Sequence, residues 1–351
     1  MTERFRIGID PAVVRADGRF GFGGGGVPML QQMPEFDVSF MPDHGPKLGP
    51  EHVDGFDAII LLGARVDGET LAGNDRLALV ARCGVGYDNV DVPACTERGV
   101  LVTITPEALS RPMAVVNLTY LLALSTRLLE QDRLTRAGRW AEKESVRGTG
   151  LMGKTVGTVG FGRIAQEFHT ISKPLGMRHL ASDPYADTAA AETLGVELAD
   201  LDQLLRESDF VVIASALTPE TRHLIDAERL ALMKPAAYLI STARGPIVDE
   251  TALYEALRER RIAGAGLDVF EQEPVDPDNP ILALDNVIVS PHALCWTDEC
   301  DRIMGESIVR AMQSVAAGQA PVTAVNRDAG DSPQVQSRLQ KIVERTGTGA
   351  P

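Results

Sequence analysis

Residues 155–165 read TVGTVGFGRIA, and this stretch decides the class of fold. An apolar run passes into Gly160-x-Gly162-x-x-Ala165 and continues into a predicted helix. Gly160 permits a tight turn, Gly162 lets the backbone approach a pyrophosphate, and a small third residue allows the helix to pack closely on the strand. The unpaired N–H groups at the start of the helix then face the pyrophosphate. The pattern predicts the strand–turn–helix unit of a dinucleotide-binding fold.

The next expected strand, HLASD, ends at Asp183, eighteen residues beyond this fingerprint. A carboxylate at this place accepts hydrogen bonds from the adenosine ribose and would repel a 2′-phosphate. Pro184 and Tyr185 follow, so no arginine is at hand to bind such a phosphate. We therefore predict NAD rather than NADP as the cofactor, held also by the first helical residues, Arg163 and Ile164.

Short apolar runs alternate with helical patterns along most of the chain, as in βαβ units with parallel sheet. The first series is RIGID, AIILL, LALVARC and VLVTI, and the second is TVGTVGF, HLASD, FVVIAS, AYLIST, AGAGLDVF and NVIVS. The fingerprint opens the second series. We therefore predict two doubly wound α/β domains: a Rossmann NAD-binding domain, residues 108–296, inserted into a flavodoxin-like substrate domain, residues 1–107 and 297–327.

Two other segments carry weaker patterns. Residues 18–26, GRFGFGGGG, lack the lysine and the strand–turn–helix frame of a phosphate-binding loop, so we expect a flexible loop. Residues 328–351 are polar and contain one short helix candidate, QVQSRLQKIVER, and we expect a mobile tail.

Residues 113–140 are helical in period and apolar on one face, and we expect a long helix that links the domains. Burial of this helix and of Trp140 against one domain alone looks insufficient. We therefore predict a two-fold symmetric homodimer.

Composition narrows the class of protein. The chain has 351 residues, of which 44% are hydrophobic and 24% charged, as in a soluble protein of two domains. A net charge of −15 argues against a nucleic-acid partner. No apolar run reaches the ~20 residues that span a bilayer, and the charged start, MTERFRIGID, does not resemble a signal peptide. We expect a cytoplasmic protein without a membrane partner.

Cysteines and histidines give no metal or disulfide pattern. The four cysteines form no CxxC pair, and the six histidines lack the spacing of metal ligands. We expect reduced thiols and no metal site.

Polar side chains follow three successive strand candidates in the second half. STARGPIVD places Arg244 after one, GLDVFEQEP carries Asp268, Glu271 and Glu273 after the next, and SPH brings His292 after the last. The carboxyl ends of parallel strands share one edge, where ligands bind, so these side chains can converge. Hydride transfer to a keto acid needs a cation for the carboxylate, an acid/base for the alcohol proton and a partner that tunes it.

LTPETRHLI, STARGPIVD, GAGLDVFEQEP and NVIVSPH resemble the signatures of the D-isomer-specific 2-hydroxyacid dehydrogenases. This family includes phosphoglycerate, hydroxypyruvate, D-lactate, formate and phosphite dehydrogenases. RCGVGYDNVDVPACTERGVLV resembles the family's substrate loop, and the resemblance is strongest across residues 155–295. It implies an NAD-dependent enzyme that interconverts a 2-keto acid and a D-2-hydroxy acid, and a homodimer.

The resemblance also implies a role for individual residues. Arg244 would bind the substrate carboxylate, which suits its planar guanidinium. His292 would be the acid/base, and Glu273 the carboxylate that favours its imidazolium form, with Glu271 as the nearest competitor for that role. The cofactor would also contact Ser215, Thr242, Ala243 and Asp268, and the backbone N–H groups of Gly84, Val85 and Gly86 would hold the substrate carboxylate.

Departures from the family pattern gather where the substrate side chain is expected. Many members read VAE where this chain has Ala114-Val115-Val116, and carry small residues where Cys295 and Trp296 follow His292. We interpret Cys295 as packing, whereas Trp296 either lines the substrate pocket or packs as core.

The substrate itself stays open. Residues 62–64 read LGA where phosphoglycerate dehydrogenases often carry an Arg–Ser pair, which counts against a phosphorylated substrate. Two other functions remain: an NAD-sensing scaffold of the same fold, like the related corepressors, and oxidation of a small non-carboxylate anion such as phosphite or formate.

Overall fold

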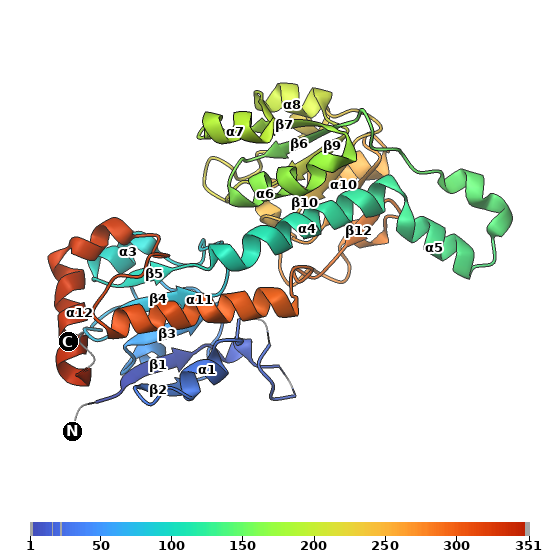
Figure 1. The fold of residues 1–351 in the computed structure, drawn as a ribbon. Coiled ribbons are helices and arrows are strands. Elements are labelled where there is room, and N and C mark those ends of the chain that lie inside the picture. The colour runs from blue at the N-terminus through green and yellow to red at the C-terminus, as the bar shows by residue number, and fades with distance from the viewer. Residues whose placement is uncertain (1–2, 16, 22, 348–351) are drawn as a thin grey trace. The chain divides into compact units, whose positions relative to one another are not determined.

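The computed structural model describes residues 3–15, 17–21 and 23–347. The chain divides into two compact units, Met1–Leu109 with Trp296–Pro351, and Ser110–Cys295 (Figure 1). Each unit is built on its own parallel sheet with helices around it, so the predicted α/β class is confirmed. No single helix of the described residues is long and apolar enough to cross a bilayer, although one helix pair, bent by 55°, reaches that length and composition.

The first unit contains a five-stranded sheet of order β2-β1-β3-β4-β5, the flavodoxin-like order. Its strands are β1 (Phe5–Ile9), β2 (Phe36–Phe40), β3 (Ala58–Leu61), β4 (Leu79–Arg82) and β5 (Leu101–Thr103). The α-helices that belong wholly to this unit are α1 (Val27–Gln31), α2 (Pro50–Val53), α3 (Val92–Glu97), α11 (Asp298–Ala316) and α12 (Pro333–Thr346). The sequence did not predict β2, because this edge strand buries only Phe36 fully and lacks a continuous apolar run.

The glycine run is packed against α11, so the expectation of a flexible loop is wrong for residues 23–26. A Cβ atom on Gly25 would lie 2.7 Å from the backbone oxygen of Asp301, and one on Gly26 would lie 2.7 Å from that of Gly305. Only residues without a Cβ allow this close approach of two backbones. Phe22, within the predicted loop, lies outside the described residues.

The expectation of a mobile tail is wrong for residues 328–347. They form a 3-10 turn (Arg327–Asp331) and α12, on which Val335, Leu339 and Ile342 are at most 1% exposed. These side chains recur at helical spacing, so one face of α12 is buried in the first unit. Residues 348–351 lie outside the described part of the chain.

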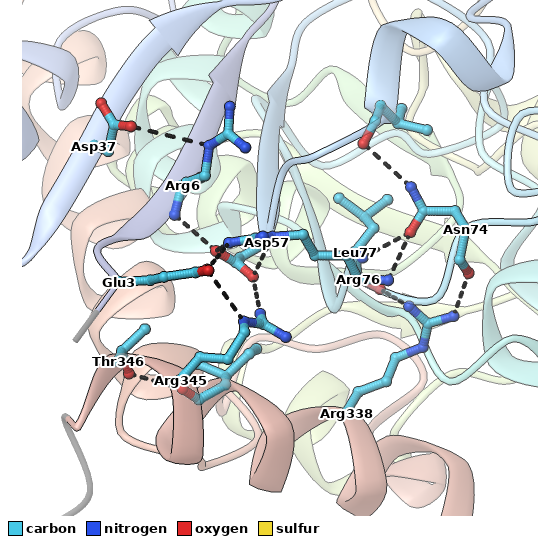
Figure 2. Close-up of polar contacts among 12 residues, drawn as sticks. Glu3, Arg6, Asp37, Asp57, Asn74, Arg76, Leu77, Arg338, Arg345 and Thr346 are labelled. Atoms are coloured by element: carbon cyan, nitrogen blue, oxygen red, sulfur yellow. Dashed lines mark hydrogen bonds and ion pairs between the residues drawn. The ribbon is translucent and has the colours of Figure 1, made fainter. Parts of the chain in front are cut away.

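Polar contacts also fasten α12 (Figure 2). Arg345 donates to the carboxylate of Asp57, which is fully buried and also accepts from Nε of Arg76 at 3.1 Å. Arg338 donates to the backbone oxygens of Leu77 and Asn74, at 2.6 and 2.8 Å. The helix therefore neutralises a buried charge of the sheet.

The second unit contains a seven-stranded parallel sheet of order β12-β11-β10-β9-β6-β7-β8. If β6 is numbered as the first strand, the order is 3-2-1-4-5-6 with a seventh strand, β12, at the edge. The first six strands have the Rossmann order, which confirms the predicted fold of this unit. The strands are β6 (Thr155–Val159), β7 (Arg178–Ser182), β8 (Glu197–Leu198), β9 (Phe210–Ile213), β10 (Tyr238–Ser241), β11 (Gly264–Leu267) and β12 (Val287–Val289). The helices are α6 (Arg163–Ser172), α7 (Thr188–Leu194), α8 (Leu201–Glu207), α9 (Ala227–Leu230) and α10 (Glu250–Arg258). The two exposed residues of β8 gave no apolar pattern to predict it.

The predicted helix over 113–140 is two helices, α4 (Pro106–Ser125) and α5 (Leu128–Arg136), followed by a 3-10 turn (Trp140–Val146). The break falls at Arg127, whose φ of 52° is left-handed and ends the helical path. Its guanidinium donates to the backbone oxygen of Ser145 at 2.9 Å, which ties the break to the turn beyond α5. The expectation of one continuous helix is therefore wrong.

Candidate active site

The glycine fingerprint sits between β6 and α6. Gly160 has a φ of 102°, and a Cβ atom there would lie 2.7 Å from the backbone nitrogen of Ser215, so the fold itself requires this glycine. Gly162 caps α6, yet a Cβ atom on it would meet nothing within 4 Å. The packing of the protein does not explain Gly162, whereas the close approach of a pyrophosphate to the free N–H groups of α6 does.

Asp183 follows β7 and is joined to the fingerprint. One carboxylate oxygen accepts from the backbone N–H of Phe161 and the other from that of Tyr185, each at 2.8 Å. Each oxygen keeps a lone pair for a ribose hydroxyl. The sequence predicted Asp183 but missed its contact with Phe161, which fixes the carboxylate beside the fingerprint.

The other predicted cofactor residues lie at the same carboxyl edge of the sheet. Arg163 is exposed and Ile164 half-buried in the first turn of α6. Ser215, just after β9, has a buried hydroxyl that finds no hydrogen-bond partner among the described residues. A ligand hydroxyl or phosphate would satisfy it, so the residues present fit a bound dinucleotide.

His292 and Glu273 are brought into direct contact. Nδ1 of His292 lies 2.7 Å from Oε2 of Glu273, and Oε1 of Glu273 accepts from the backbone N–H of Phe270 at 3.0 Å. Burial alone would raise the pKa of Glu273, but the hydrogen bond and charge of His292, the Phe270 N–H and the charge of Arg244 lower it below its usual value. The three predicted catalytic residues thus share one electrostatic environment.

Glu271, the competing carboxylate, is engaged elsewhere. Its Oε1 lies 2.8 Å from Nε2 of His223 and accepts from the backbone N–H of Glu250 at 3.1 Å. The carboxylate that contacts His292 is therefore that of Glu273.

Three more predicted residues follow β10 and β11. Asp268 is fully buried, and its Oδ2 finds no hydrogen-bond partner in the described part of the chain. The hydroxyl of Thr242 donates to Oδ1 of Asn117 at 2.7 Å, and the backbone oxygen of Ala243 accepts from Arg244 at 2.7 Å. Sequence reasoning missed Asn117, a fully buried polar residue on α4.

The predicted substrate residues Gly84, Val85, Gly86 and Trp296 belong to the first unit. Gly84 has a φ of 129°, and its N–H donates to the hydroxyl of Thr105 at 3.0 Å. The Gly84 N–H is therefore already used. Of the three backbone N–H groups predicted to hold the substrate carboxylate, those of Val85 and Gly86 remain candidates. Trp296 is 51% exposed and does not pack as core, whereas Cys295, 6% exposed, is buried.

Comparisons of the whole chain with known proteins found the following similarities. Residues 118–293 match the family model of the D-isomer specific 2-hydroxyacid dehydrogenase, NAD binding domain. A glyoxylate reductase from Korarchaeum cryptofilum is 40% identical over 300 residues, which are 84% of this chain and 90% of the relative.

Two solved structures are similar over nearly their whole length. D-lactate dehydrogenase from Aquifex aeolicus, complexed with NAD and lactic acid, has a TM-score of 0.78 and 26% identity, covering 98% of this chain and 100% of that one. An NADPH-dependent glyoxylate/hydroxypyruvate reductase from Sinorhizobium meliloti, in complex with NADP and malonate, has a TM-score of 0.79 and 26% identity, covering 95% and 98%.

Proposed function

Because the chain belongs to the D-isomer specific 2-hydroxyacid dehydrogenase family and is an NAD-dependent oxidoreductase, we propose that it reduces a small, unphosphorylated 2-keto acid of the glyoxylate class. Relatives from Korarchaeum and from Thermococcus, 40% and 43% identical, carry the name glyoxylate reductase. The residues LGA at 62–64 support a substrate without a phosphate, because they offer no cation to bind one.

The contact between His292 and Glu273 carries the proposal. Since Nδ1 of His292 is held by a carboxylate at 2.7 Å, Nε2 is the ring nitrogen left for a substrate oxygen. The carboxylate of Glu273 can stabilise the positive charge that the imidazole carries when it donates a proton.

The proposed mechanism assigns one task to each residue. A nicotinamide dinucleotide, which the fingerprint at Gly160 and Gly162 and the carboxylate of Asp183 would hold, would supply the hydride. His292 donates the proton that the carbonyl oxygen takes up, and Glu273 stabilises the charge on the imidazole until that step. Arg244 holds the substrate carboxylate with two parallel hydrogen bonds. In the reverse direction His292 accepts the alcohol proton.

Oxidation of NADH by the purified protein, followed with a panel of keto acids, tests the proposal. We expect turnover with glyoxylate and hydroxypyruvate and little with phosphohydroxypyruvate, and we expect none with His292→Ala on the same panel. Binding of NADH without turnover of any keto acid would favour the scaffold, and reduction of NAD by phosphite or formate would favour anion oxidation.

A further inference from the structure

A chain of three polar side chains lies beside the turn that carries His292. Tyr120 on α4, Ser290 after β12 and Asp268 after β11 come together although they are far apart in sequence. The Tyr120 hydroxyl lies 2.5 Å from Oγ of Ser290, which donates to Oδ1 of Asp268 at 2.5 Å. Tyr120 and Asp268, the two ends of this chain, are 2% and 0% exposed, and Ser290 between them is half-buried.

The strand beneath Tyr120 makes room for its ring. A Cβ atom on Gly266 of β11 would lie 2.4 Å from Cδ1 of Tyr120, which no side chain tolerates. The glycine and the tyrosine therefore fit each other. The seated ring brings its hydroxyl to Ser290 and also within 3.0 Å of the backbone oxygen of Leu267, a second acceptor for the same proton.

The hydroxyl protons point toward the carboxylate. Burial raises the pKa of Tyr120 far above its usual value, so this side chain stays a neutral hydroxyl. Ser290 gives its only proton to Asp268, so the single hydroxyl proton of Tyr120 is shared between Ser290 at 2.5 Å and the Leu267 oxygen at 3.0 Å. Such a chain stabilises a buried carboxylate more than a single hydroxyl would.

Asp268 in turn holds the backbone next to His292. Its Oδ1 also accepts from the N–H groups of Ala293 and Leu294, at 3.2 and 3.4 Å. His292 has a φ of 52°, a left-handed conformation that residues with a side chain rarely adopt. The bonds to the two following amides secure this turn, and the turn places the imidazole against Glu273.

We propose that Tyr120 and Ser290 are positioning residues for His292. They fix the carboxylate of Asp268, which fixes the turn that aims His292 at Glu273. This inference rests on the proposed function, because the positioning matters for catalysis only if His292 is the acid/base.

Removal of each hydroxyl tests the inference. Tyr120→Phe keeps the ring against Gly266, and we expect kcat for keto-acid reduction to fall about fivefold, the worth of one neutral hydrogen bond, with little change in the KM for the keto acid. Ser290→Ala removes a bond to a charged group and should lower kcat about tenfold or more. Ser290→Thr keeps the hydroxyl and should restore kcat to within about twofold.

A second readout needs no substrate. The imidazole of His292, assigned by the signal missing in His292→Ala, can be titrated by NMR. We expect it to titrate at lower pH in Tyr120→Phe, because looser contact with Glu273 favours the imidazolium less. Tyr254→Phe is the matched control: this tyrosine lies on α10, packs against the core of the same unit and should leave kcat and the titration unchanged.

The outcomes separate the two ideas. If the unmodified protein reduces keto acids and His292→Ala does not, but Tyr120→Phe and Ser290→Ala equal the unmodified protein in kcat and titration, the positioning proposal is wrong and the proposed function stands. If no keto acid is reduced, the proposed function is wrong, and an unmoved His292 titration would then overturn the positioning as well.

Discussion

The carboxylate of Asp183 accepts a hydrogen bond from the backbone N–H of Phe161, inside the glycine fingerprint, at 2.8 Å. The side chain that we predict to select the ribose thus also holds the loop that we predict to receive the pyrophosphate. A substitution of Asp183 can therefore alter both the choice between NADH and NADPH and the conformation of the glycine loop. Substitutions that keep or remove the acceptor for the Phe161 N–H separate these two effects.

We expect NADH to exceed NADPH by at least about tenfold in kcat/KM in the unmodified protein, because Asp183 repels a 2′-phosphate. Asp183→Asn removes the charge and keeps an acceptor for the Phe161 N–H, so it should reduce this ratio with a modest loss for NADH. Asp183→Ala should impair both cofactors. Equal efficiency with both cofactors in the unmodified protein would refute the role given to Asp183.

Arg244→Lys keeps the charge and loses the planar pair of donors. We expect a higher KM for the keto acid together with a lower kcat, since a single ammonium does not orient a carboxylate. Arg258→Lys, on the exposed side of α10, is the matched control and should leave both constants unchanged. Kinetic constants equal to those of the control would argue against a carboxylate site at Arg244.

The ion pairs of α12 predict a stability effect without a kinetic one. Arg345→Ala leaves the buried Asp57 with one guanidinium partner, Arg76, beside the backbone N–H of Arg6, and should lower the free energy of unfolding by about 1–3 kcal/mol. Arg302→Ala removes an exposed pair with Glu306 on α11 and should cost less than about 1 kcal/mol. Equal denaturation midpoints for the two variants would show that α12 contributes little.

A buried histidine pair predicts loss of stability in acid. Nδ1 of His169 lies 2.8 Å from Nδ1 of His179, and burial, with the charge of His179, lowers the pKa of His169 from 6.5 to about 3. The unfolded chain binds this proton more readily, so stability falls as pH drops from 6.5 toward 3. Thermal unfolding of His169→Gln should depend less on pH in this window, and an equally steep fall would contradict the assignment.

Self-association is the remaining prediction. Leu128 and Trp140, on α5 and the turn after it, are 55% and 68% exposed, and we propose that a second copy of the chain covers them in a two-fold dimer. Sedimentation should give a dimer that Trp140→Arg weakens, whereas Tyr185→Arg, at a more exposed aromatic, should not. A monomer at micromolar concentration would rule the dimer out.

The sequence predicted those features whose cause is local or periodic. The fingerprint, the buried strands and the residues that end them follow from spacing alone, and the resemblance then supplied the roles of Arg244, Glu273 and His292. The structure places these residues at one edge, while their roles stay predictions. The edge strands β2 and β8 were not predicted, because they bury little apolar surface and so lack an apolar run in the sequence.

Other features depend on the folded chain. The break at Arg127 has no sequence signal, because arginine is not a residue that typically adopts φ above zero. The packing of Gly25 and Gly26 against α11 joins segments almost three hundred residues apart. The contact of Tyr120 with Ser290 likewise exists only once α4 has packed on β11 and β12.

The central claim is that His292 is the acid/base and that Glu273 tunes it, and the pH dependence of kcat for keto-acid reduction tests it most directly. The contacts with His292 help to lower the pKa of Glu273, so its carboxylate is ionised at neutral pH and can stabilise a positive charge on the imidazole that it touches. His292→Ala should reduce kcat by about 10²–10⁴ at every pH. Glu273→Gln should shift the decline of reduction to lower pH, so that activity lost at neutral pH partly returns in acid. Near-normal turnover by His292→Ala, or an unmoved profile in Glu273→Gln, would contradict the account.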